Sequence, residues 1–248
     1  MLQPSFFRHA VYVHCLCSHD IDHPGHGAAF EVQAQSPLAQ RHNDTSVLEA
    51  HHSHLTFVLL KNEELNIFSN LSREESMYCR KMIIKCILGT DMAKHASLVK
   101  RLCSRCDSGC QGDCSTNDLE NYTRQQLLDV ENERDRFDLA EITVHAADLS
   151  AQIGPFQLAK EWGKRLSQEF RQEAKLHEEA GLSAPAFMTS INSDYDLFQI
   201  QCSFIRKIVL PLWEALNKVV GNLGDPVARL QDNLQMYEKR LKEMEKGD

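Results

Sequence analysis

The chain has 248 residues, 42% hydrophobic and 25% charged, with a formal net charge of -8, which suits one globular domain with a sizeable core. The acidic balance argues against nucleic acid as a partner. The longest apolar runs, 11–17 and 205–212, are too short for a membrane span, and no signal cleavage site follows the first run.

The pattern of apolar residues predicts an all-α fold. Glycine and proline are scarce, at 11 and 7 residues, and apolar residues recur at steps of three and four. The predicted helices are, in chain order, 47–60, 74–88, 134–149, 156–179, 197–220 and 226–245.

The last of these helices has a clear start signal and one apolar stripe. Asp225 suits the cap position and Pro226 the first helical position. The stripe of Val227, Leu230, Leu234, Tyr237, Leu241 and Met244 predicts packing on the domain's own core. A coiled-coil partner surface is the alternative, and a homodimer is left open.

Residues 102–117 break the helical pattern and are predicted to form a cysteine-rich loop between helices. Cys103, Cys106, Cys110 and Cys114 could close a structural zinc site, although their spacing is not that of a standard finger or ribbon, and free thiols are the favoured interpretation. The nine cysteines are an odd number in a chain without a signal peptide, which favours reduced thiols and a cytoplasmic location.

His19 and Asp20 are candidate metal ligands. Neutral imidazole nitrogen and carboxylate oxygen both bind divalent cations. Pro24 and Gly25 follow closely, so the pair should stand at a helix end, where both side chains can turn into one cleft. Alone, such a pair is also common as a surface or capping feature.

Further acidic and imidazole side chains stand at helical spacings. Asp148 ends a strongly apolar helix, where a carboxylate needs a partner or bonds to backbone groups. Glu49 and His52 lie one turn apart, as a support for metal ligands or as an ordinary helix face. Asp91 stands four residues before His95, which faces both side chains into one site or makes a simple intrahelical pair.

Gln201 and Phe204 lie three residues apart on one predicted helix. An amide can bind the edge of a planar heterocycle while an aromatic ring stacks on its face. The same spacing also occurs when one residue caps and the other packs in a core.

The order and spacing of five segments give these candidates a context. HDIDHPG, HNDTSVLEAHH, KMIIKCILGTDMAKH, VHAADLS and QCSFIRKIVLPLWE resemble the catalytic domain of class I cyclic nucleotide phosphodiesterases, over about residues 19–246. The resemblance implies a compact multi-helix domain with two divalent metal ions, typically zinc and magnesium or manganese. It also implies hydrolysis of the 3′ phosphoester of cAMP or cGMP in signal transduction, with a cyclic nucleotide as the partner.

The resemblance also assigns roles to individual residues. The first metal's ligands would be His19, Asp20 and Asp148, and Asp20 would bridge to the second metal. Side chains that hold metal-bound water or support the ligands would be His23, Glu49, His52, Thr90 and Asp91. Gln201 and Phe204 would clamp the purine.

The sequence departs from the family pattern at two places. The family's HNxxHAxDV motif, which supplies the general acid and a fourth ligand of the first metal, lies well upstream of the HD pair, and neither His9 nor His14 matches it. We therefore expect a domain without its N-terminal helices that is nearly inactive by itself. A remnant that binds a cyclic nucleotide or a protein without hydrolysis is the alternative.

The second departure follows Asp148, where Ala151 and Gln152 replace the Asn-Pro that the family often has. One polar contact to the purine is therefore missing. Because the Gln201 amide can flip to meet either purine edge, the choice between cAMP and cGMP stays open.

Overall fold

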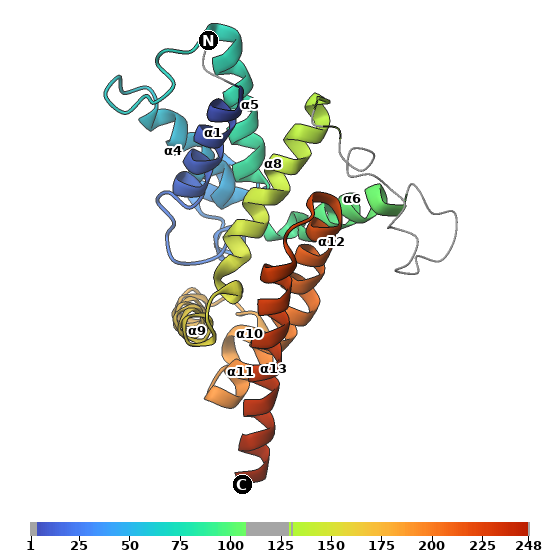
Figure 1. Cartoon of the computed structure of the whole chain (residues 1–248). Helices are drawn as coiled ribbons and strands as arrows, with labels where there is room; N and C mark the ends of the chain where they lie inside the picture. The colour runs from blue at the N-terminus through green and yellow to red at the C-terminus, as the bar shows by residue number, and fades with distance from the viewer. Residues whose placement is uncertain (1–3, 108–128, 130, 248) are drawn as a thin grey trace. The chain divides into compact units, whose positions relative to one another are not determined.

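The structure, a computed structural model, describes residues 4–107, 129 and 131–247. These residues form helices and turns without a strand among them, which confirms the predicted all-α fold (Figure 1). The chain divides into two compact units: Met1–Lys94, Phe137–Asp148 and Leu176–Ser183 form the first, and His95–Arg136, Leu149–Lys175 and Ala184–Asp248 the second. Among the described residues no helix is both long and apolar enough to cross a membrane.

The first unit is built on α1, α4 and α5, which lie side by side (Figure 1). Its helices are α1 Pro4–Ser18, α2 Ala28–Gln33, α3 Pro37–Arg41, α4 Val47–Leu59, α5 Arg73–Leu88, the 3₁₀ turn η1 Met92–Lys94, and the later part of α8 Glu133–Asp148. Their apolar faces bury Cys15, Ile83, Cys86 and Val144 in one core. Burial of a large apolar side chain contributes about 1.5–3 kcal/mol, so this core holds the ends of α1 and α8 in place.

The second unit packs α11 beside α13 (Figure 1). Its elements are α6 His95–Asp107, the 3₁₀ turn η3 Leu149–Ile153, α9 Phe156–Glu179 as far as Lys175, α10 Ala186–Thr189, α11 Asp194–Phe204, the π turn η4 Ile205–Val209, α12 Leu210–Val220 and α13 Gly224–Gly247. Leu230 and Tyr237 are fully buried in its core, and Leu234 and Leu241 pack against it. Four residues of the predicted α13 stripe therefore pack on the core, whereas Met244, near the end of the helix, is exposed.

Two helices begin at capping boxes, which explains where their predicted starts were wrong. At α5, Ser72 Oγ accepts from the Glu75 N–H and the Glu75 carboxylate accepts from the Ser72 N–H, so α5 begins one residue early, at Arg73. At α11, Ser193 and Asp196 form the same pair, and the helix begins at Asp194 rather than at residue 197. A cap of this kind contributes about 1 kcal/mol.

A π turn divides the predicted helix 197–220. In η4 the Leu210 N–H bonds to the Ile205 carbonyl five residues back. Pro211 follows directly, has no N–H, and its ring would clash with the carbonyl four residues before it in a regular α-helix. The wider turn accommodates the proline, so the chain continues as a helix with a shifted phase.

Two other predicted boundaries were wrong. The last helix begins at Gly224, so Asp225 and Pro226 lie inside its first turn rather than at a cap. The predicted loop 102–117 is helical in its first part, since α6 continues to Asp107 with an exposed Cys103. Cys110 and Cys114 lie outside the described residues, and the structure does not describe the side chain of Cys106.

Candidate metal centre and base-binding cavity

His19 and Asp20 stand directly after the end of a helix, as predicted, although this helix, α1, was not among the predicted ones. The His19 N–H still bonds to the Cys15 carbonyl at 2.9 Å, so the helix positions the imidazole before the chain turns away. The turn then uses left-handed backbone at Asp22 (φ 60°) and Gly25 (φ 78°). The pair therefore sits on the end of a helix that is anchored in the core.

The structure brings His19, Asp20 and Asp148 together. The His19 Nε2 atom lies 3.1 Å from Asp148 Oδ1 and 3.5 Å from Asp20 Oδ2. One ligand atom from each residue lies within 4.8 Å of the others. His19 Nδ1 lies 3.0 Å from the Leu16 carbonyl, which it reaches as a donor, so Nε2 faces the carboxylates. One imidazole and two carboxylates form a donor set suited to a divalent cation.

A proton on His19 offsets one of the two negative charges of this cluster. Its hydrogen bond to Asp148 raises the pKa of His19 to about 9, although burial of the ring opposes the shift. In the metal-free protein the imidazole is therefore a cation between two carboxylates. A divalent cation would replace that proton and satisfy the same oxygens.

His52 and His23 lie beside Asp20. The His52 Nδ1–H donates to the Ile21 carbonyl at 2.7 Å, and His52 Nε2 is 3.9 Å from Asp20 Oδ1. The rings of His52 and His23 stack with centroids 5.7 Å apart. Burial lowers the pKa of His52, so a neutral ring at neutral pH supports the acidic side chain without adding charge.

The Asp91 carboxylate lies close enough to Glu49 to affect the pKa of that residue. Burial is the largest cause that raises the pKa of Glu49 to about 7, and the charges of Asp91 and Asp20 add to it. Glu49 Oε2 is buried and has no hydrogen-bond partner in the described part of the chain. A buried oxygen without a partner is costly unless water or a cation satisfies it.

Thr90 lies just after the end of α5, directly before Asp91. Its buried hydroxyl donates to the Ile87 carbonyl at 2.8 Å and closes the end of α5. Asp91 follows at once, and its Oδ1 accepts from the Ala93 N–H at 2.8 Å. Thr90 therefore fixes the backbone that presents Asp91.

Sequence reasoning missed Ser46, which lies next to this group. Ser46 has left-handed backbone (φ 44°, ψ 50°), and its hydroxyl donates to Asp91 Oδ2 at 2.7 Å instead of capping α4. A serine before a helix predicts a cap, so the sequence signal favoured the backbone of α4 over Asp91 as the partner of this hydroxyl.

Gln201 and Phe204 line one cavity within the second unit. This cavity measures about 170 Å³ and is lined by Gly163, Leu166, Ser167, Phe170, Phe187, Ile191, Leu197, Ile200, Gln201 and Phe204. Gln201 is 4% exposed, and its Oε1 has no hydrogen-bond partner among the described residues. The apolar lining with one buried amide suits a flat, partly polar ring.

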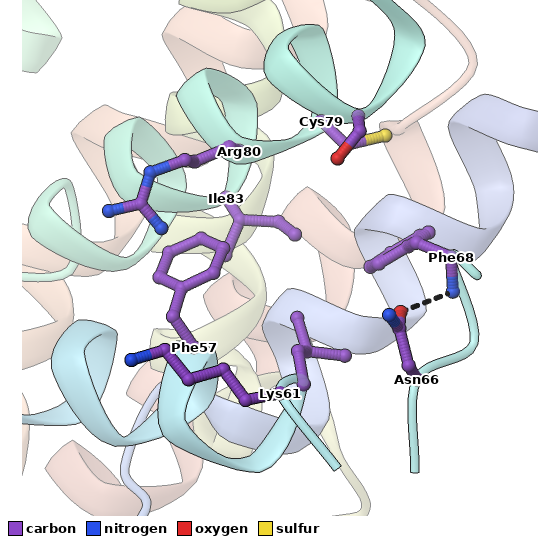
Figure 2. Close-up of a pocket in the computed structure, with 9 residues that line it drawn as sticks. Phe57, Lys61, Asn66, Phe68, Cys79, Arg80 and Ile83 are labelled. Atoms are coloured by element: carbon purple, nitrogen blue, oxygen red, sulfur yellow. Dashed lines mark hydrogen bonds between the residues drawn. The ribbon is translucent and has the colours of Figure 1, made fainter. Parts of the chain in front are cut away.

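A different cavity, of about 220 Å³, lies between α4, α5 and the segment that joins them (Figure 2). Its floor includes Phe57 and Ile83, and the Arg80 guanidinium lies over the Phe57 ring at 4.1 Å from the centroid. The Asn66 side chain accepts from the Phe68 N–H at 3.0 Å (Figure 2). None of the predicted metal or purine residues lines this cavity.

Comparisons with known proteins identify the family of the chain. The sequence profile of the family described as 3'5'-cyclic nucleotide phosphodiesterase matches residues 5–230. The chain is 33% identical to the 3',5'-cyclic-AMP phosphodiesterase 4C of Rattus norvegicus over 90% of its own length and 39% of that protein. It is 34% identical to isoform F of the Drosophila melanogaster 3',5'-cyclic-AMP phosphodiesterase, over 91% of this chain and 32% of the relative.

A solved structure gives the same result. The phosphodiesterase domain of a rhodopsin–phosphodiesterase fusion protein from Salpingoeca rosetta superposes with a TM-score of 0.86 at 30% identity, covering 97% of this chain and 71% of that one. The chain spans less than half the length of the curated relatives named here. From the profile match and the shared helical fold, we conclude that the chain belongs to the 3'5'-cyclic nucleotide phosphodiesterase family.

Proposed function

We propose that this chain provides the metal-binding and base-binding parts of an enzyme that hydrolyses 3',5'-cyclic nucleotides to 5'-monophosphates. The observation that carries the proposal is the convergence of His19, Asp20 and Asp148 within 4.8 Å. The relatives named above are cyclic-AMP phosphodiesterases, which supports cAMP as the first substrate to test and cGMP as the second.

The cluster would hold the first of two divalent cations, with zinc there and magnesium or manganese beside it. His19 Nε2 and the carboxylates of Asp20 and Asp148 suit the first ion, and Asp20 would also contact the second. Bound cations would supply Lewis-acid activation of a water molecule and neutralise the charge of the phosphate.

The surrounding residues would hold the ligands and the water in place. The Leu16 carbonyl fixes the His19 ring, and His52 lies beside Asp20. Glu49 Oε2, a buried oxygen without a partner in the described chain, can accept a hydrogen bond from water in the site. The hydroxyl of Ser46 donates to the Asp91 carboxylate and would orient it to accept a hydrogen bond from water in the site as well.

In the second unit, Gln201 and Phe204 would bind the base. The amide offers one donor group and one acceptor to the purine edge, and the ring of Phe204 offers a face for stacking. The small, mostly apolar cavity excludes water from the base, which strengthens the hydrogen bonds to the amide.

A cytoplasmic role in cyclic nucleotide signalling is part of the proposal. The structure shows free thiols at six cysteines, which are Cys15, Cys17, Cys79, Cys86, Cys103 and Cys202. Free thiols are usual in reducing compartments, where cyclic nucleotides act as internal signals.

The test is hydrolysis of cAMP and cGMP, with added Zn²⁺ and Mg²⁺, by this chain and by the protein that the complete transcript encodes. Asp148→Ala should lower turnover at least about tenfold, because it removes a charged ligand. Asp44→Asn is the matched control, since Asp44 is exposed with φ 58°, a conformation that asparagine also adopts. Equal turnover by the transcript-encoded protein and by its Asp148→Ala variant would reject the assignment of the metal site.

A binding assay separates catalysis from binding alone. Calorimetric titration with cAMP and with adenosine 5′-monophosphate should show binding that Gln201→Ala weakens. Binding without turnover by the full transcript product would contradict the enzyme and identify a nucleotide-binding protein instead.

A further inference from the structure

Gly163 lies inside α9, where glycine is an unfavourable choice. The helix extends over 24 residues, and alanine at an interior position would stabilise it relative to glycine. Gly163 is buried and lines the same cavity as Gln201. Glycine at a buried interior helix position is explained when a neighbouring group occupies the space that a side chain would need.

That reason is the side chain of Gln201. A Cβ atom added at Gly163 would lie 2.9 Å from Gln201 Nε2, 3.1 Å from its Cδ and 3.4 Å from its Cγ. Apart from the two adjacent residues and the helix's own backbone, these three atoms are the nearest neighbours of the added carbon. The Gln201 amide therefore lies directly against the α9 backbone, in space that any other residue at 163 would occupy.

We propose that Gly163 is a positioning residue for Gln201: its missing side chain lets the amide lie against α9 and keeps the base cavity open. This inference rests on the proposed base-binding role of Gln201. A larger residue at 163 would displace the amide toward the cavity, because Gln201 is only 4% exposed and the cavity is the space that both residues share. The result would be a narrower slot with its polar edge out of place.

In such a variant we expect the Gln201 side chain to move and the backbone fold to be retained. Gln201 is a flexible side chain, and its Oε1 has no partner in the described residues to hold it. At Gly89 an added side chain would meet backbone as well, because its Cβ would lie 2.5 Å from Glu141 Cγ and 3.1 Å from the Lys85 carbonyl oxygen, which cannot move aside. The expected effect of Gly163→Ala is therefore on binding more than on stability.

A double-mutant cycle tests the contact without any ligand. Wild type, Gly163→Ala, Gln201→Ala and the double variant are compared by thermal unfolding. With Gln201 removed, Gly163→Ala should raise Tm by roughly 2–4 °C, the usual gain of alanine over glycine in a helix. With Gln201 present, the gain should be smaller or reversed.

Titration with adenosine 5′-monophosphate in the presence of Mn²⁺ tests the consequence for binding. Gly163→Ala should weaken binding by about three- to tenfold, the effect of losing one hydrogen bond. Gly224→Ala is the matched control, because a Cβ there meets nothing within 4 Å, and its affinity should equal that of wild type.

The outcomes separate this inference from the proposed function. Equal Tm gains with and without Gln201, or unchanged affinity in Gly163→Ala, would overturn the positioning role. Failure of the wild-type protein to bind the nucleotide would contradict the proposed function, and the unfolding cycle would still decide whether Gly163 accommodates Gln201.

Discussion

The imidazole of His19 and the carboxylate of Asp148 approach to 3.1 Å, although 129 positions separate them in the chain. His19 follows α1 and Asp148 ends α8, and the two helices bury side chains in the same core. The core therefore fixes the distance between two groups that would otherwise be free to move apart. Their ion pair stands in the place that we propose for a cation.

The metal-free protein should lose stability as the pH rises toward 9. The folded-state pKa of His19 is about 9, against 6.5 for the unfolded group, so the folded protein binds this proton more tightly. The resulting stabilisation is fully present below pH 6.5 and is lost as the pH rises through 9. Thermal unfolding in EDTA across this range measures it.

The Asp148→Asn variant is the control for this pH dependence, because it removes the main cause of the raised pKa. Its Tm should change less with pH over the same range. An unchanged slope would show that another group titrates.

Glu49→Gln should stabilise the metal-free protein above pH 7. Burial raises the pKa of Glu49 from 4.5 to about 7, so the folded state favours the protonated acid. That stabilisation is present below pH 4.5 and is lost as the pH rises through about 7. Glutamine does not titrate, so the difference should grow over this window to the order of 1–3 kcal/mol.

Urea unfolding in EDTA at pH 5 and pH 8 measures this difference. Glu63→Gln, at an exposed position, should show none. A variant less stable than wild type at pH 8 would contradict a buried carboxylate without a partner.

Substitutions at Ser46 should separate the role of its hydroxyl from that of its backbone. Ser46→Ala removes the bond to Asp91 and keeps left-handed backbone that alanine disfavours, so it should cost about 1–3 kcal/mol. Ser46→Gly also removes the bond but adopts φ 44° freely, and should cost less. Thermal unfolding ranks the two, and an equal loss would mean that the backbone conformation costs nothing.

Asn233→Ala should destabilise the protein by about 1–3 kcal/mol, because one buried and one partly buried carbonyl lose their donor. The Asn233 Nδ2 atom donates to the Gln152 carbonyl at 2.7 Å and to the Gly154 carbonyl at 2.9 Å. Denaturant unfolding measures the loss. Gln235→Ala, at an exposed position on the same helix, should stay within about 0.5 kcal/mol of wild type, and a similar loss in both would contradict the role of the two bonds.

The sequence predicted the helices with strong apolar periodicity to within a residue, as α4 and α9 show. Their burial pattern repeats along the chain, so local residues suffice to find them. The start of α11 was missed because the capping box of Ser193 and Asp196 depends on two polar residues before the apolar pattern begins. Helix α1 was missed because its short apolar stretch is interrupted by histidines.

The site required more than local patterns. Spacing alone could not select Asp148 as the partner of His19, and the resemblance of five ordered segments supplied that link. Ser46 was not predicted, because its left-handed backbone turns the hydroxyl away from α4. The closeness of Gly163 to Gln201 is a tertiary contact across 38 positions, which composition and periodicity do not encode.

The π turn ahead of Pro211 lies between that proline and the two residues that we propose for base binding. A π turn shifts the rotational phase of a helix, so we expect the direction in which Gln201 and Phe204 face the cavity to depend on Pro211, which does not line that cavity. Replacing that ring by a residue with an N–H would allow the regular spiral to return and rotate the amide. A substitution at Pro211 would then change nucleotide binding, although this residue does not contact the proposed base.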